Sequence, residues 1–118
     1  MSDEYEMTLS VRLPGPLSDG ELAGLRWHLG IGPRPAGPGG PDPLLADCGT
    51  LTEAPDGWTL TAHREVHPDE FDDLGILLRR LATRTGVQGP VVVGQLRFHE
   101  SEVAEPLVVR RDTVEWPA

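Results

Sequence analysis

The segment near the amino terminus alternates apolar and polar side chains with a strict period of two. This alternation predicts a β-strand with one face on a core and the other face in water. Later segments repeat the pattern, so we expect a sheet that exposes one polar face. The apolar positions are Tyr5, Met7, Leu9, Val11 and Leu13, and the polar positions between them are Glu6, Thr8, Ser10 and Arg12.

Two segments have the periodicity and end signals of helices. Ser18 and Glu21 have capping-box spacing, which predicts a first helix over 19–29. A second helix over 68–84 has acidic residues at its start and arginines at its end, as the helix dipole favours, and His67 is its candidate N-cap. Its apolar stripe, which we expect to contact the sheet, consists of Phe71, Leu74, Leu77, Leu78 and Leu81.

The other segments with regular patterns are predicted to be strands. Those at 44–52 and 58–66 flank turn residues at 54–57, which predicts a hairpin. Two further strands, at 90–98 and 106–116, are expected to pair across an acidic connection. In the strand at 90–98, the alternation predicts that Val92, Leu96 and Phe98 face the core, and that Val91, Val93, Gln95, Arg97 and His99 face outward.

This order of elements, β-α-β-β-α-β-β, predicts an α+β fold. Right-handed crossovers would place both helices on one face of an antiparallel sheet, giving a ferredoxin-like fold with an extra C-terminal strand. The length favours one domain over residues 1–118. Within it, residues 30–43 read GIGPRPAGPGGPDP, a composition that predicts a flexible loop.

The charge balance restricts the classes of partner. Net charge is −9, from 19 acidic residues against 10 basic residues, all of them arginine. Such a surface repels nucleic acid and anionic membranes but attracts a basic protein. The single cysteine, Cys48, and the absence of an export leader or a long apolar run favour the cytoplasm. The lack of Lys and Asn, with abundant Gly, Pro, Ala and Arg, suggests a GC-rich bacterial genome.

The outward face gathers polar side chains with the chemistry of binding sites. His63 and Glu65 share one strand face, and Arg97 and His99 lie on another strand. Successive outward residues stand about 7 Å apart on a strand, whereas zinc needs donors within about 2.3 Å. His63, Glu65 and His67 therefore cannot all bind one ion while the strand continues, although two of them could do so together with His99. We expect them to be ordinary exposed polar positions, and we predict no metal and no cofactor.

Two comparisons of sequence pattern bear on function. An open sheet resembles the RNA-binding sheet of RRM domains, but Thr8, Ser10, Gln95 and Arg97 occupy the positions where that family stacks bases on aromatic rings. RNA binding is therefore not expected. The second half resembles small immunity proteins of bacterial polymorphic toxin systems, through GWTLTAHRE, LGILLRRLA, VVVGQLRFHESE and PLVVRRDTVEW. This resemblance implies a stoichiometric partner that blocks a toxin's active site.

We therefore expect a non-enzymatic protein-interaction domain, such as a toxin-neutralising immunity or accessory factor, with no catalytic residues. The open sheet face is also a candidate surface for a homodimer. A small-molecule-binding protein or enzyme that uses the outward His, Glu and Arg side chains is the alternative, and outward Val91 and Val93 would support it. The candidate binding residues are His63, Glu65, Arg97, His99, Glu100 and Glu102.

Overall fold

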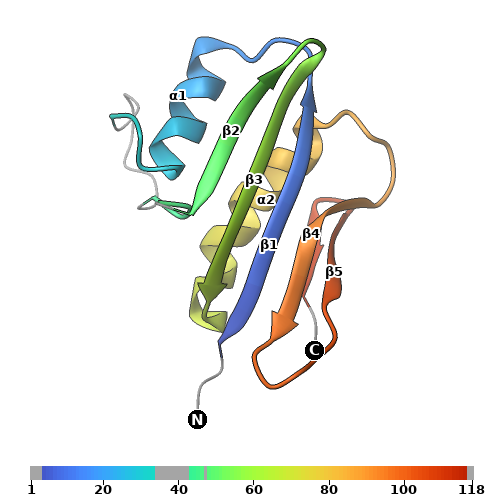
Figure 1. Ribbon diagram of the computed structural model, residues 1–118. Coiled ribbons are helices and arrows are strands. Elements are labelled where there is room, and N and C mark those ends of the chain that lie inside the picture. The colour runs from blue at the N-terminus through green and yellow to red at the C-terminus, as the bar shows by residue number, and fades with distance from the viewer. Residues whose placement is uncertain (1–3, 34–42, 47, 117–118) are drawn as a thin grey trace.

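In the computed structural model, the described residues form a six-stranded antiparallel sheet and two helices (Figure 1). The structure describes residues 4–33, 43–46 and 48–116. The strand order is β2-β3-β1-β4-β5-β6. The fold class predicted from the sequence, α+β, is confirmed.

Most of the element bounds agree with the signals in the sequence. The strands are β1 (Tyr5–Pro14), β2 (Gly49–Ala54), β3 (Gly57–Val66), β4 (Val91–Phe98), β5 (Glu105–Arg110) and β6 (Thr113–Glu115). The helices are α1 (Asp19–His28), α2 (Phe71–Arg84) and a 3-10 turn, η1 (Pro68–Glu70), that leads into α2.

Side-chain caps define where both helical segments begin. The Ser18 hydroxyl accepts a hydrogen bond from the Glu21 N–H at 3.1 Å, and the Glu21 carboxylate accepts from the Ser18 N–H at 3.0 Å. His67 Nδ1 accepts from the Asp69 N–H at 3.1 Å, so the predicted N-cap precedes η1. The capping box and the His67 cap are therefore confirmed.

The core lies between the sheet and α2. The inward residues of β1, which are Met7, Leu9, Val11 and Leu13, are almost completely buried. Opposite them, α2 buries Leu74, Leu77, Leu78 and Leu81, which confirms most of its predicted stripe. The helix α1 lies beside α2 (Figure 1), and His28 is the only one of its residues that is buried.

The predicted facing of β4 is wrong at its start. Val93 is fully buried, whereas Val92 is 62% exposed. The cause is a register shift between Val92 and Gly94 in the pairing with β5, because a bulge of this kind moves the following side chains to the other face. Gly94 is required there, since a Cβ would lie 2.1 Å from the Thr8 carbonyl oxygen.

Two predicted strands also have different bounds. The segment at 106–116 is a hairpin, because Arg111 and Asp112 both have positive φ angles and reverse the chain between β5 and β6. The segment at 44–52 enters the sheet only at Gly49. Before it, Leu44 and Leu45 are buried in a turn, and the Leu45 N–H donates to the His28 carbonyl oxygen at 2.8 Å. Of the predicted loop at 30–43, residues 34–42 lie outside the described residues.

Candidate functional site

Strand register brings the outward polar residues into neighbouring rows on the open sheet face. Glu6 of β1 pairs with Glu65 of β3 on one side and with Arg97 of β4 on the other. The next row holds His63, Thr8 and Gln95. Two of the predicted site residues, His63 and Arg97, therefore flank the central strand at adjacent positions.

Glu6 connects these two side chains, although it was not among the candidate residues predicted from the sequence. Its carboxylate lies 3.2 Å from Arg97 Nη2 and 3.5 Å from His63 Nε2. The hydrogen bond from Arg97 is the largest cause that lowers the pKa of Glu6 from its ordinary value, and His63 lowers it further. Only the strand register places Glu6 between the two residues, so a single sequence could not select it.

The connection between β4 and β5 is ordered by its own hydrogen bonds. Arg97 Nη1 donates to the Ser101 carbonyl oxygen at 2.8 Å, and the Ser101 N–H donates to the Phe98 carbonyl oxygen at 2.8 Å. The His99 N–H donates to the Glu4 carbonyl oxygen at 3.2 Å, so His99 lies beside the start of β1. Glu100 and Glu102 are exposed on this connection, and Glu100 lies 3.7 Å from His99.

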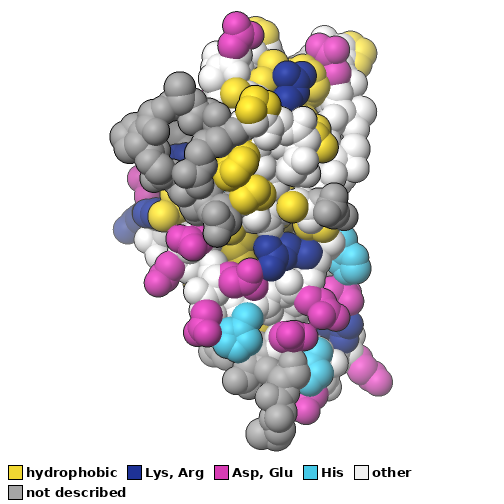
Figure 2. Space-filling view, turned by 90° about the vertical axis from the view of Figure 1, so that its left-hand side faces the viewer, with side chains coloured by type: hydrophobic (Ala, Val, Ile, Leu, Met, Phe, Trp, Pro, Cys, Tyr) yellow, Lys and Arg dark blue, Asp and Glu magenta, His cyan; other side chains and the backbone are white. Residues whose placement is uncertain are grey.

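One end of the molecule therefore carries a concentration of carboxylates. This acidic end comprises the start of β1, the end of β3, η1 with the first turn of α2, and the β4–β5 connection. Figure 2 shows acidic side chains and histidines gathered over the lower part of one side. Its exposed carboxylates are Glu4, Glu65, Asp69, Asp72, Asp73, Glu100, Glu102 and Glu105.

The arginines described at the acidic end are engaged within the chain. Arg97 is bonded to Glu6, and Arg64 Nη2 lies 2.6 Å from the Glu70 carboxylate. Arg64 also donates to the Leu44 carbonyl oxygen. Each of these two arginines is ion-paired with a partly buried glutamate, so neither neutralises the more exposed carboxylates of the acidic end.

The structure does not gather the predicted residues into a catalytic or metal-binding set. Within the described residues, no group of three or more His, Cys, Asp or Glu side chains is arranged to hold a metal ion. Cys48 precedes β2 and is partly buried. Val91 and Val93, which the sequence placed on the open face, pack toward the core, so they provide no apolar contact there.

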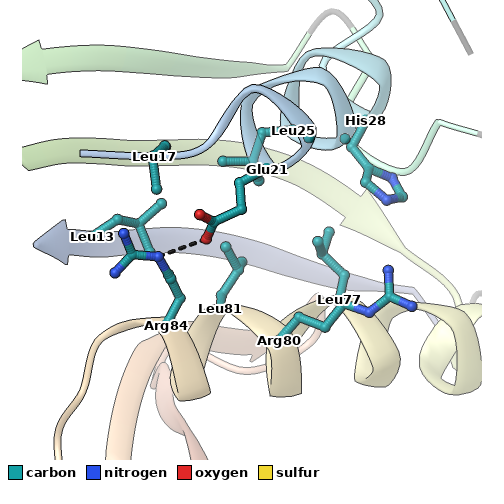
Figure 3. Close-up of a pocket in the computed structure, with 11 residues that line it drawn as sticks. Leu13, Leu17, Glu21, Leu25, His28, Leu77, Arg80, Leu81 and Arg84 are labelled. Carbon is teal, nitrogen blue, oxygen red and sulfur yellow. Dashed lines mark hydrogen bonds and ion pairs between the residues drawn. The ribbon is translucent and has the colours of Figure 1, made fainter. Parts of the chain in front are cut away.

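A different feature, a cavity between α1 and α2, was not predicted from the sequence. It has a volume of about 290 Å³ and lies on the helical side of the sheet (Figure 3). Gly20 and Gly24 line it, four residues apart on α1. Two glycines inside a helix are the only signal in the sequence that could have pointed to it, because glycine disfavours helix interiors.

Comparisons with known proteins gave no match to a family model, to a curated protein or to a solved structure. None of the helices in the described part of the chain is long and apolar enough to cross a membrane.

Proposed function

We propose that this chain is a non-enzymatic protein-interaction domain whose acidic end binds a basic surface of a partner protein. The observation that carries the proposal is the concentration of exposed carboxylates at one end, where Arg64 and Arg97 are already paired internally. Nearby arginines therefore do not cancel the negative electrostatic field of these carboxylates, and this field would attract a basic partner. Complementary charge of this kind raises the association rate and helps to select the partner.

The ordered β4–β5 connection within the acidic end also supports a binding role. The β4–β5 connection is held by hydrogen bonds from Arg97 and Ser101, so Glu100 and Glu102 project from an ordered turn. A preorganised surface loses less conformational entropy when it binds than a flexible one.

We also propose that the part from β1 to β4 has the ferredoxin-like topology. Support comes from the order β2-β3-β1-β4, with α1 following β1 and α2 following β3.

A toxin-neutralising immunity or accessory factor is the form of interaction protein that the resemblance of the second half favours. The cytoplasm is the proposed location, which rests on the single cysteine.

The test compares two double variants that change the net charge equally. Glu100→Gln with Glu102→Gln alters the acidic end, whereas Asp19→Asn with Glu53→Gln alters exposed carboxylates near the opposite ends of the strands. Each variant and the unaltered protein are immobilised and exposed to lysate of the host organism. A partner recovered at equal stoichiometry is then purified for kinetic measurements at two salt concentrations.

We expect the acidic-end variant to associate with the partner more slowly and with less dependence on salt. The control variant should behave like the unaltered protein. Recovery of no stoichiometric partner, or equal association rates for all three proteins at both salt concentrations, would contradict the proposal. Recovery of a second copy of the chain would instead support a homodimer through the open sheet face.

A further inference from the structure

The cavity between α1 and α2 has apolar walls and two polar ends. Leucines from β1, from the segment after it and from both helices form the walls. At one end Arg84 Nε lies 2.6 Å from the Glu21 carboxylate, and at the other His28 and Arg80 lie near each other (Figure 3). The wall leucines are Leu13, Leu17, Leu25, Leu77 and Leu81.

The open volume exists because α1 presents glycine toward it. A Cβ added at Gly24 would meet no atom within 4 Å, and one at Gly20 would meet only the Ser18 hydroxyl, at 4.0 Å. Neither glycine has a positive φ angle. Alanine would therefore fit at both positions and would favour the helix, so neither close packing nor backbone conformation explains the two glycines.

The end of the cavity near His28 offers hydrogen-bond donors. His28 is buried, and its Nδ1 accepts from the Leu44 N–H at 3.4 Å, which leaves the proton of a neutral ring on Nε2. Burial, and then the positive charge of Arg80, lower the pKa of His28 and so favour the neutral form of the ring. Among the described residues, Arg80 has no carboxylate within ion-pair distance. A guanidinium and an N–H group together match a carboxylate, which only accepts hydrogen bonds.

We propose that this cavity binds a small monocarboxylate with an apolar body, of the size of a medium-chain fatty acid. Its carboxylate would accept hydrogen bonds from Arg80 and His28, and its apolar body would lie against the wall leucines. The volume of about 290 Å³ is near the lower end of the range for small-ligand sites. Glu21 does not repel the ligand strongly, because it lies at the opposite end and is paired with Arg84.

The experiment titrates the full chain with octanoate, octanol and octylammonium, each below its aggregation concentration, and follows backbone and methyl NMR signals. Saturable octanoate binding should shift the signals of Leu25, Leu77 and Leu81. Octanoate should bind at least about tenfold more tightly than octanol, as a charge-assisted hydrogen bond of typical strength implies. Octylammonium should bind most weakly, because it places a cation beside Arg80.

Three variants distinguish recognition of the carboxylate from simple filling of an apolar space. Arg80→Gln should weaken octanoate binding about tenfold and leave octanol unchanged, whereas Arg79→Gln, an equal charge change on an adjacent exposed residue, should have no effect. Gly24→Leu should abolish binding of both ligands by filling the cavity, while circular dichroism reports an intact fold. Equal binding of octanoate and octanol to the unaltered protein, shifts confined to other residues, or no saturable octanoate binding would each overturn the proposal.

Discussion

Adding a side chain has opposite consequences at two glycine positions in this fold. At Gly94 a Cβ would lie 2.1 Å from the Thr8 carbonyl oxygen and 2.9 Å from Leu9 Cα, both in the backbone of the central strand. At Gly24 the same atom would enter open space. The residue type is identical, and only the tertiary environment decides what a methyl group does there.

Gly94→Ala should therefore lower the free energy of unfolding by about 3 kcal/mol, because strands β1 and β4 must separate to admit the methyl group. Gly24→Ala should raise it by about 0.5–1 kcal/mol through better helix propensity. Urea denaturation of both variants measures the two changes. Changes of the same sign would contradict the assigned surroundings of one glycine or the other.

His28 should make stability depend on pH near neutrality. Its ordinary pKa is 6.5, and burial, with Arg80, lowers that value in the folded state. As the pH falls below about 6.5, the unfolded chain gains a proton that the folded chain does not accept, so the free energy of unfolding decreases. At higher pH both states are neutral and this contribution to the pH dependence vanishes.

The measurement is the midpoint of urea denaturation between about pH 7.5 and pH 5, together with NMR titration of the imidazole signals. His28→Gln should reduce the decrease in stability over this range. A His28 ring that titrates at or above 6.5, or a variant with the same pH dependence as the unaltered protein, would contradict the expectation.

The two helices contribute unequally to the fold. The helix α2 buries four leucines against the sheet, whereas Leu22 and Leu25 of α1 are only partly buried. The contacts that hold α1 are polar at both ends, through Glu21 with Arg84 and through His28 with Leu44. The core therefore depends on α2, and α1 covers the cavity.

Leu78→Ala should cost about 2–5 kcal/mol, because Leu78 is fully buried and its truncation leaves a cavity in the core. Leu22→Ala, the same change at a partly buried position of α1, should cost less than half as much. Chemical denaturation under identical conditions compares them. Equal losses would mean that α1 is packed as tightly as α2.

Local sequence signals predicted elements well and predicted the tertiary arrangement less well. The capping residues Ser18 and His67 and the stripe of α2 could be identified because their signals lie within one turn or one helix face. The bulge in β4 could not, because it is defined by pairing with β5. For the same reason the sequence selected His63 and Arg97 but not Glu6, which joins them from the central strand.

Across the whole chain, the buried core and the acidic end proposed to bind a partner use different residues. Burial is concentrated between the sheet and α2, whereas many of the exposed carboxylates gather where β1 and α2 begin and β3 and β4 end. Glu6 and Glu65 even face each other across two paired strands, and like charges in that position destabilise a sheet. The arrangement of carboxylates at the acidic end therefore does not maximise the stability of the fold. This is what we expect of a surface selected for binding.

This separation predicts that charge can be removed from the acidic end without loss of stability. Glu65→Gln should raise the free energy of unfolding by about 0.2–1 kcal/mol, because it removes the repulsion from Glu6. Glu100→Gln with Glu102→Gln should change it by about 0.5 kcal/mol or less, as at ordinary surface sites. Denaturation at low and at high salt measures both changes, and the gain from Glu65→Gln should shrink in high salt because ions screen exposed charges. A loss of more than about 1 kcal/mol in either variant would show that these carboxylates stabilise the fold, and would remove the argument that they are kept for a partner.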